Sequence, residues 1–487
     1  MSDALFEGRL EKMTRLREGG VNPFPARVPD TEAVSFVIER HENLAAEEHS
    51  GEKVSVAGRL TAFRKMGKAA FLDVRDGTAR IQIHATMDRL GEASFAALRE
   101  ADIGDHLAFF GEVFRTKRGE LTIAAESWTH LSKSLRPLPE KWHGLKDAET
   151  RHRHRSLDLI SNDDVRRTFT QRSRLIASIR SFLNRHGFLE VETPTLQPIP
   201  GGAAARPFTT HHNALDADLY MRVALELYLK RILIGGFDRV YEIGKCFRNE
   251  GVSTEHNPEF TMLEIYQAYT DVEGIMAQTE ALIVDALQET IGTLAIDFAE
   301  HAIDFTPPWP RISMRSAVEQ ATGIDLDGTA DEVRARADAV DIPLPSGSWG
   351  VLVAELFERA VESTLIQPTF ITDYPVEISP LAKKNPADER FVERFELFIA
   401  GMEVSNGFTE LNDPIDQRSR FEAQEALRAS GDEEAHRIDE DFLFALEHGM
   451  PPTGGVGIGI DRLVMLATGS TSIRDVIFFP TLRRKDD

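Results

Sequence analysis

The sequence predicts an α+β protein, in which a small N-terminal β-barrel is followed by a larger domain with helices flanking an antiparallel sheet. Residues 51–132 contain short β-rich runs separated by glycines and charged turns, a spacing typical of a small barrel. From residue 161 onward, helical patterns alternate with long strands in which apolar and polar residues alternate. Such strands have one buried and one polar face, which favours an antiparallel sheet over a doubly wound parallel one.

Length and composition are those of a multi-domain protein without disulfides. The 487 residues suffice for two or three domains with separate cores. The net charge of −23 argues against binding polyanions over the whole surface, so nucleic acid would need local basic patches. The single cysteine, Cys246, excludes a disulfide framework and a thiolate zinc cage. No apolar run is long enough to span a membrane and the charged N-terminus is unlike a signal peptide, so we expect a cytoplasmic protein without membrane contact.

In order along the chain, we expect a helical extension over residues 1–50, the barrel over 51–135, a proline- and charge-rich connector over 136–160 and the larger domain over 161–487. After Arg166 apolar residues recur at helical spacing, and FLEVETPTL predicts a strand that Pro194 stops. The remaining pattern predicts helices near 222–234, 271–290, 348–363, 416–429 and 460–468, and strands at 237–249, 259–269, 391–411 and 454–459.

The stretch FRNEGVSTEHNPEFTMLEIYQAY, residues 247–269, reads as a strand, a polar loop and a second strand. In the second strand, a period of two places Phe260, Glu264 and Tyr266 on one face. Burying a carboxylate there costs several kcal/mol unless a cation meets it. Glu264 therefore predicts a cationic partner.

The loop of this stretch carries groups suited to a nucleotide. Arg248 lies at the end of the first strand, and Glu250, His256 and Asn257 lie in the loop. Arginine and histidine suit phosphate oxygens, and the aromatic face of Phe260 accepts a purine. These residues predict a nucleotide pocket without a glycine-rich phosphate loop. The alternative is a solvated hairpin whose phenylalanine belongs to the core.

A second stretch, RFELFIAGMEVSNGFTEL, places carboxylates in an otherwise apolar run. Asn406, Phe408 and Glu410 share one face, whereas Glu396 and Glu403 lie on either side of a break in the strand. Two carboxylates near a nucleotide suit Mg2+, which binds one or two carboxylates together with phosphate oxygens. A single strand carboxylate could instead pair with a core arginine, but that explanation is weak for three.

A third stretch, PTGGVGIGIDRLVMLATG, is rich in glycine. Its glycines match neither the dinucleotide fingerprint nor the P-loop, so close packing of a strand on a helix explains them better. Arg462, at the start of that helix, can reach back towards a triphosphate. Elsewhere, Glu226 interrupts the apolar face of a helix, and the glycines of residues 199–208 leave backbone open to a ligand.

Together these blocks resemble the class II aminoacyl-tRNA synthetases, and most closely the bacterial lysyl-tRNA synthetases. FLEVETPTL is similar to motif 1 of that family, FRNEGVSTEHNPEFTMLEIY to motif 2 and GGVGIGIDRLVML to motif 3; ELYLKR and NGFTELND add specificity. The resemblance covers nearly the whole chain. It implies an OB-fold barrel that reads the anticodon, a class II catalytic domain and a homodimer formed through motif 1. The implied reaction joins L-lysine to tRNA(Lys) through lysyl-adenylate, with ATP as substrate and Mg2+ as cofactor.

The resemblance also implies roles for single residues. Arg248 and Arg462 would be the catalytic residues, with Arg248 on the α-phosphate and the lysine carboxylate. The ATP-binding residues would be Arg248, Glu250, His256, Asn257, Phe260 and Arg462, with Glu250 on the adenine amino group and Phe260 under the ring. Mg2+ would be bound by Glu396 and Glu403. Lysine, with its two ammonium groups, would be bound by Gly202, Glu226, Arg248, Glu264, Tyr266, Asn406, Phe408 and Glu410.

In the barrel, the anticodon contacts of the family match Arg59, Phe71, Gln82 and Glu126, with Ser127 as an alternative register for the last. A base would stack on Phe71 and accept hydrogen bonds from the glutamine and the arginine. The alternative for Phe71 is a core position. A local positive field would come from Arg64, Lys65, Lys68, Lys117 and Arg118.

The chain departs from the family pattern at His152 and Ser156, where tyrosines are usual, and at Leu225, where proline is common. Three rival functions stay open. An aspartyl or asparaginyl synthetase would need cations in the side-chain pocket instead of glutamates. A synthetase-like ligase that lysylates a protein would lack the barrel. A scaffold that only binds RNA would not need the arginines and metal carboxylates.

Overall fold

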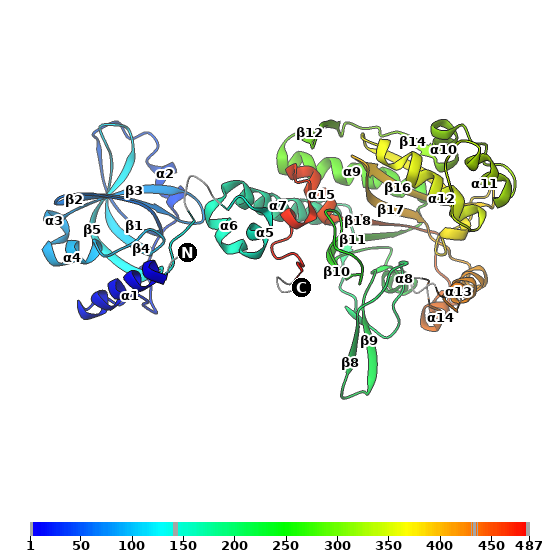
Figure 1. The fold of residues 1–487 in the computed structure, drawn as a ribbon, viewed down its shortest axis with the longest axis horizontal. Coiled ribbons are helices and arrows are strands. Elements are labelled where there is room, and N and C mark those ends of the chain that lie inside the picture. Colours follow the sequence, from blue (N-terminus) through cyan, green and yellow to red (C-terminus); the bar gives the residue numbers. More distant parts are fainter. Residues whose placement is uncertain (1–2, 140–144, 430, 432–434, 436, 484–487) are drawn as a thin grey trace. The chain divides into compact units, whose positions relative to one another are not determined.

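The computed structural model describes residues 3–139, 145–429, 431, 435 and 437–483, and the chain divides into two compact units, Met1–Leu145 and Lys146–Asp487 (Figure 1). Residues 140–144 of the expected connector lie outside the described residues, as do residues 1–2 and 484–487. Among the helices that are described, none is both long and apolar enough to cross a membrane.

The first unit is built around a closed barrel with strand order β1-β2-β3-β5-β4. Alternate residues such as Val56, Leu72 and Ile83 fill its interior, because successive side chains of a strand point to opposite faces. The barrel predicted from the β-rich runs is therefore confirmed. Its strands are β1 (His49–Met66), β2 (Ala69–Arg75), β3 (Arg80–Thr86), β4 (His106–Arg115) and β5 (Leu121–Ser132), with helices α1 (Asp3–Glu18), α2 (Val34–Arg40), α3 (Met87–Leu90) and α4 (Glu92–Leu98).

The second unit contains an eight-stranded sheet with the order β14-β15-β16-β17-β18-β11-β10-β6. Among these strands, the pairs β14–β15 and β10–β6 are parallel and the others are antiparallel, so the predicted, largely antiparallel sheet is confirmed. The strands are β6 (Leu189–Glu190), β10 (Arg239–Phe247), β11 (Glu259–Ala268), β14 (Arg311–Ser313), β15 (Thr369–Pro375), β16 (Phe391–Ile399), β17 (Met402–Thr409) and β18 (Thr453–Gly459).

The two faces of this sheet meet different partners. On β11, the odd-numbered Leu263 and Ile265 belong to a dry core shared with α7 (Asp163–Arg185), α9 (Val272–Ile291) and α15 (Ile460–Thr468). The even-numbered Tyr266 packs instead with residues of α8 (Glu226–Ile234), on the other side of the sheet (Figure 1). The period of two thus separates a hydrophobic face from a face that can carry polar groups.

The remaining elements surround this sheet. Helices α10 and α12 contribute to a second hydrophobic cluster with residues of β15 and β16. The remaining elements of the second unit are α5 (Ala148–Arg153), α6 (Arg155–Ser161), β7 (Leu196–Gln197), β8 (Thr209–His212), β9 (Ala217–Met221), β12 (Ala295–Phe298), β13 (His301–Asp304), α10 (Met314–Thr322), α11 (Ala330–Asp338), α12 (Trp349–Ala360), η1 (Glu362–Thr364), η2 (Val376–Ile378), α13 (Pro414–Ala429), α14 (Glu440–Leu446) and α16 (Ile473–Val476).

Two expected elements differ from those observed. The strand expected over 391–411 is a hairpin of β16 and β17, because Ala400 and Gly401 both have positive φ angles, 55° and 74°, and turn the chain. The helix expected from residue 222 begins only at Glu226. The residue before it, Leu225, directs its backbone N–H to the carboxylate of Glu264 on β11, so the start of α8 is joined to the polar face of the sheet.

Candidate active site

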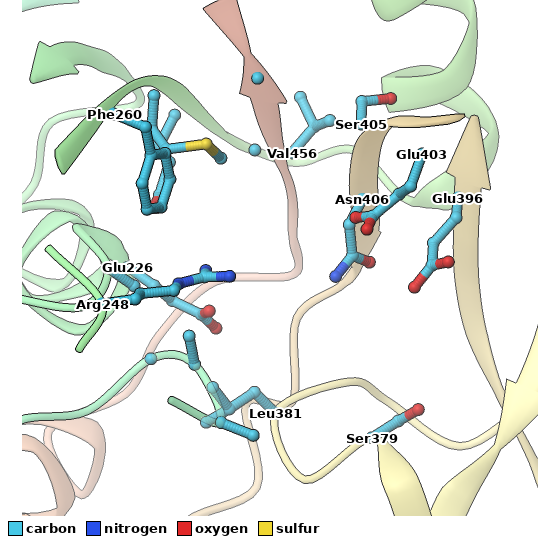
Figure 2. Close-up of a pocket in the computed structure, with 18 of the residues that line it drawn as sticks. Glu226, Arg248, Phe260, Ser379, Leu381, Glu396, Glu403, Ser405, Asn406 and Val456 are labelled. Carbon is cyan, nitrogen blue, oxygen red and sulfur yellow. The ribbon is translucent and has the colours of Figure 1, made fainter. Parts of the chain in front are cut away.

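A cavity of about 590 Å3 lies on the polar face of the sheet in the second unit. Its walls come from β11, β17, β18, the start of α8, the loop after β10 and the first turn of α15. Figure 2 shows Arg248 and Glu226 entering it from one side, and Glu396, Glu403 and Asn406 from the other. Of the residues singled out in the sequence, the cavity is lined by Gly202, Glu226, Arg248, Glu250, His256, Asn257, Phe260, Glu264, Tyr266, Glu396, Glu403, Asn406, Phe408 and Arg462.

One end of the cavity combines a cation with an aromatic ring. The guanidinium of Arg248 lies 5.1 Å from the centroid of the Phe260 ring. Its Nε is buried and has no hydrogen-bond partner among the described residues. A buried arginine nitrogen without a partner is costly, so it fits a site that an anionic ligand completes. Glu250 lies on the exposed loop beside them and also lines the cavity.

His256 and Arg462 meet beside this end. The ring Nε2 of His256 lies 3.3 Å from Nη2 of Arg462, and its Nδ1 lies 3.1 Å from Oγ of Ser253. Arg462 also contacts Glu403, at 3.6 Å from its carboxylate. Asn257 differs, because its side-chain amide donates to the backbone of Glu259 and accepts from the backbone N–H of Thr481. These positions suit a chain of phosphates, with Asn257 mainly holding the loop.

The two candidate metal carboxylates lie on the two strands of the β16–β17 hairpin. Glu396 accepts hydrogen bonds from Arg394 at 2.6 Å and from the Tyr374 hydroxyl at 2.8 Å. Burial raises the pKa of Glu396 to about 7, and the neighbouring Glu403 carboxylate adds to the rise. A divalent cation would offset both effects. In the described part of the chain, no three His, Cys, Asp or Glu side chains form a metal-binding cluster. Mg2+ commonly binds one or two carboxylates together with phosphate oxygens, and this pair of carboxylates fits that pattern.

The part of the cavity lined by Glu226 and Glu264 is acidic, and both carboxylate side chains are buried. Glu264 is 5% exposed and accepts hydrogen bonds from the Leu225 N–H at 3.0 Å and from the Tyr266 hydroxyl at 2.9 Å. Burial raises the pKa of Glu264 to about 7, and the nearby Glu226 carboxylate adds to the rise. Gly202 closes this end with a φ of +89°, and a Cβ there would lie 3.2 Å from Cβ of Glu226. A side chain at that position would narrow the cavity.

Behind this end lies a buried cation that the sequence analysis did not single out. Lys230 is fully buried and forms ion pairs with both Glu226 and Glu410. Glu410 is not among the residues that line the cavity, although its carboxylate lies directly beneath Gly455, which does. The signal available in the sequence was the spacing of four between Glu226 and Lys230 on a helix.

On the barrel, the outer face of β2 and β3 carries the expected aromatic and amide groups. Phe71 is partly exposed and stacks on His84, with ring centroids 4.6 Å apart, while its neighbours Ala70 and Leu72 are in the core. Gln82 lies on the same face and accepts a hydrogen bond from Thr122. Phe71 is therefore not a core residue, and His84 is an aromatic partner that the sequence analysis missed.

Arg59 lies further along the same outer face, because it pairs with Arg75, four residues from Phe71 on β2; its anticodon role stays a prediction. A register shift between Leu60 and Ala62 reverses which residues of β1 face outward, so Arg64 pairs with Phe71 and Arg59 pairs with Arg75. Arg59 instead donates to the carbonyl of Gly104 at 3.0 Å, and burial lowers its pKa.

A second register shift lies beside Glu126. It falls between Phe110 and Gly111, and Ser127, not Glu126, pairs with Phe110. Glu126 forms an ion pair with Lys53 at 2.8 Å.

Comparison with known proteins connects both units to one family. Residues 147–483 match the family described as "tRNA synthetases class II (D, K and N)", and residues 54–131 match "OB-fold nucleic acid binding domain". The chain is 53% identical over 482 residues to the lysine–tRNA ligase of Moorella thermoacetica, covering 98% of each chain. It is 53% identical over 482 residues to that of Bacillus subtilis, covering 98% of this chain and 97% of the relative.

The chain belongs to the lysine–tRNA ligase family of class II tRNA synthetases. The barrel of the first unit is thus an OB-fold, and the antiparallel sheet of the second is the class II catalytic sheet. The chain is an enzyme that forms aminoacyl-tRNA. Of the rival functions, the match excludes a protein-modifying ligase without a barrel and a scaffold that only binds RNA.

None of the three departures from the pattern of the lysine–tRNA ligases is among the residues that line the cavity. His152 is buried and its Nε2 lies 2.9 Å from Asp475, whereas Ser156 is exposed. Leu225 is fully buried, and its N–H is the donor to Glu264. Proline has no N–H, so the leucine supplies this chain with a hydrogen bond that a proline there could not make.

Proposed function

We propose that the chain activates L-lysine with ATP, giving lysyl-adenylate and pyrophosphate, and then transfers the lysyl group to the 3′ end of tRNA(Lys). The single observation that carries the choice of amino acid is the acidic end of the cavity. Glu226 and Glu264 line it and Glu410 lies just behind, and Arg248 lies against Phe260 in the same cavity. An amino acid with two ammonium groups suits the carboxylates, and a nucleotide suits Arg248 and Phe260.

The chemistry needs no nucleophile from the protein. The lysine carboxylate attacks the α-phosphorus, and the bond from that phosphorus to the bridging oxygen breaks as pyrophosphate leaves. Arg248 would bind the α-phosphate and the lysine carboxylate, so it holds the two reactants together and neutralises charge on the phosphate oxygens. Phe260 would stack under the adenine, with Glu250 on its amino group, and His256, Asn257 and Arg462 would lie along the β- and γ-phosphates.

The carboxylates of Glu396 and Glu403 would hold Mg2+, with Arg394 and Tyr374 orienting Glu396. When bound, the ion supplies positive charge to the phosphates. At the amino-acid end, the carboxylates would take the two ammonium groups, with Gly202, Tyr266, Asn406 and Phe408 shaping the space around the side chain.

Amino-acid-dependent exchange of pyrophosphate into ATP tests the proposed function. We expect exchange with lysine and not with aspartate or asparagine, followed by charging of tRNA(Lys). Exchange with aspartate or asparagine would identify one of the sibling specificities instead. No exchange with any amino acid would contradict the proposal.

The affinity for lysine should depend on pH through Glu264. An ammonium group binds the ionised carboxylate, and burial raises the pKa of this carboxyl to about 7. Protonation on the acid side therefore weakens binding, and we expect the KM for lysine to fall about tenfold as pH rises from about 6 to about 8. Steady-state exchange kinetics at constant ionic strength measure this; a KM that is flat across the range would contradict the assignment.

The variant Leu225→Pro tests whether Glu264 sets the pH at which the KM for lysine falls. It removes the N–H that donates to Glu264, a bond that lowers the pKa of that carboxyl. The fall in KM should then occur at higher pH than in the unmodified protein, with kcat at saturating lysine changed little. Leu225→Ala keeps the N–H and serves as the control.

For the first unit, we propose that Phe71 stacks an anticodon base, with Gln82 and Arg64 beside it. A stacked base is worth about 1–3 kcal/mol, so Phe71→Ala should lower kcat/KM for tRNA charging about tenfold or more. Pyrophosphate exchange, which needs no tRNA, should stay unchanged. Arg64→Gln should weaken charging more than Arg59→Gln, because only Arg64 pairs with Phe71 across the strands. Equal effects, or loss of exchange, would contradict this arrangement.

We also propose a homodimer formed through the motif 1 region. Leu189 and Leu196 are each 47% exposed and Phe237 is 52% exposed, which is unusual for large apolar side chains in one region. Sedimentation equilibrium should give twice the 54.4 kDa of one chain. A monomer mass at micromolar concentration would exclude it.

A further inference from the structure

The amino-acid end of the cavity contains a cation of its own. Lys230 is fully buried on α8 and pairs with Glu226, one turn earlier on the same helix, and with Glu410, just after β17. Two aromatic rings flank the ammonium group, with centroids 5.4 Å away for Phe408 and 6.0 Å away for Phe442. A fully buried lysine is rare unless it is paired, so this arrangement is a built feature of the site.

Charge balance suggests what this cation does. Glu226, Glu264 and Glu410 supply three negative charges, and Lys230 supplies one positive charge. The group therefore carries a net charge of −2 when all four are ionised. Free lysine brings two ammonium groups to the same end of the cavity. Without Lys230, one carboxylate too many would be buried.

We infer that Lys230 is a built-in counter-cation, a positioning residue that sets the net charge of the amino-acid pocket to −2 and matches it to a dicationic amino acid. The inference rests on the proposed function. In this role Lys230 does not contact the amino acid. It favours the ionised form of Glu226 and Glu410 and holds both carboxylates in place. Its role is electrostatic, so its loss should change how many protons accompany ligand binding, which loss of packing alone would not do.

The surroundings support a proton-linked readout. Glu264 and Tyr266, on β11, are close enough to influence the titration of Glu226 and Glu410. The positive charge of Arg394, on β16, lowers the pKa of Glu226. Burial raises the pKa of Glu410, and Lys230 opposes that rise. If the lysine is removed, the surplus carboxylate would take up a proton in the free protein. An ammonium group that binds nearby would then lower the pKa of that carboxyl and favour release of the proton.

Isothermal titration calorimetry tests the inference on the full chain. Lysine is titrated in two buffers of different ionisation enthalpy, which gives the number of protons released per lysine bound. We expect Lys230→Met to release about one more proton than the unmodified protein at pH 7, and to bind lysine about tenfold more weakly, with the deficit shrinking at higher pH. Lys230→Arg, which keeps the charge, should keep the original proton count whatever its affinity.

A second pair of variants keeps the test decisive if Lys230→Met does not fold. Glu410→Gln leaves a net charge of −1, and the double variant Lys230→Met/Glu410→Gln restores −2. The double variant should release about one more proton than Glu410→Gln alone and the same number as the unmodified protein. It buries no surplus charge, so it should fold.

Lys133 provides a matched control. It is also a fully buried lysine paired with two carboxylates, Asp102 and Asp105, but it lies in the first unit. Lys133→Met should leave the proton count for lysine unchanged. Thermal unfolding and ATP binding show whether each variant is folded.

The outcomes separate the inference from the proposed function. If the unmodified protein binds no lysine, the proposed function fails. If it binds lysine but Lys230→Met weakens binding equally at every pH with no change in proton count, the inference alone fails and Lys230 only packs. An equal count for Glu410→Gln and the double variant would also overturn the inference.

Discussion

Replacing Arg248 with glutamine should lower kcat/KM for lysine-dependent pyrophosphate exchange by about 10²- to 10³-fold, the usual cost of removing one donor to charge that develops in the transition state. Arg248 enters the cavity beside Phe260, with a buried Nε that has no partner among the described residues (Figure 2). Glutamine keeps a donor but not the positive charge. The loss should therefore appear mainly in kcat, with a smaller change in the KM for ATP.

An exposed arginine elsewhere in the second unit provides the control for this variant. Arg167 lies on α7, pairs with Asp164 three residues away and is remote from the cavity lining. Arg167→Gln should leave exchange unchanged. Full activity of Arg248→Gln, with its thermal unfolding unchanged, would remove Arg248 from the proposed chemistry.

Replacing Glu264 with glutamine should raise the KM for lysine about 10²-fold, because removing one partner of a buried charge pair costs about 2–5 kcal/mol. Glutamine keeps the shape. Its carbonyl oxygen can still accept from the Leu225 N–H while its amide nitrogen donates to the Tyr266 hydroxyl, but it cannot pair with an ammonium group. The dependence of KM on pH near 7 should disappear with the carboxyl. Steady-state exchange kinetics measured from pH 6 to pH 8 give both results.

The control for this variant lies on the same strand. Glu259, at the exposed start of β11, pairs weakly with Lys245 at 3.7 Å and is not part of the cavity lining. Glu259→Gln should change neither the KM for lysine nor its pH profile. A pH profile that persists in Glu264→Gln would assign the titration to another group.

Much of the site could be predicted because it lies on regular strands. A period of two placed Phe260, Glu264 and Tyr266 on one face of β11, and the same rule joined Asn406 and Phe408 on β17. All five line one cavity. The alternation in the sequence therefore carried information about which side chains share a surface, even before the order of the strands was known.

In the barrel, the period of two is interrupted within a strand. The register shift near residue 61 of β1 exchanges the inner and outer positions, and no residue type in the sequence marks it. Arg59 was expected near Phe71 from the family resemblance; the structure pairs Arg64 directly with Phe71, and the anticodon role of Arg59 stays a prediction. A second register shift lies beside Glu126, so that Ser127 is the residue that pairs with Phe110.

The pairing of Lys230 with Glu410 could not be predicted from the sequence either. Glu410 was expected among the residues that bind the amino acid; the structure places it just behind the cavity wall, paired with Lys230, and its contact with the amino acid stays a prediction. Which lysine meets which carboxylate depends on how α8 packs on β11 and β17, and these contacts join residues 180 positions apart. The observed pairing explains how so many glutamates are tolerated in a dry region: part of their charge is neutralised within the protein.

The central claim, that an acidic, dry pocket selects a dicationic amino acid, is tested most directly by calorimetric binding of lysine and of norleucine, which lacks the ε-ammonium group. A pocket built to pair a charged group rejects an analogue without it by roughly 10⁴-fold or more. We therefore expect a clear lysine isotherm and no measurable heat for norleucine at millimolar concentration. Comparable affinity for the two ligands would show that the carboxylates do not select the amino acid.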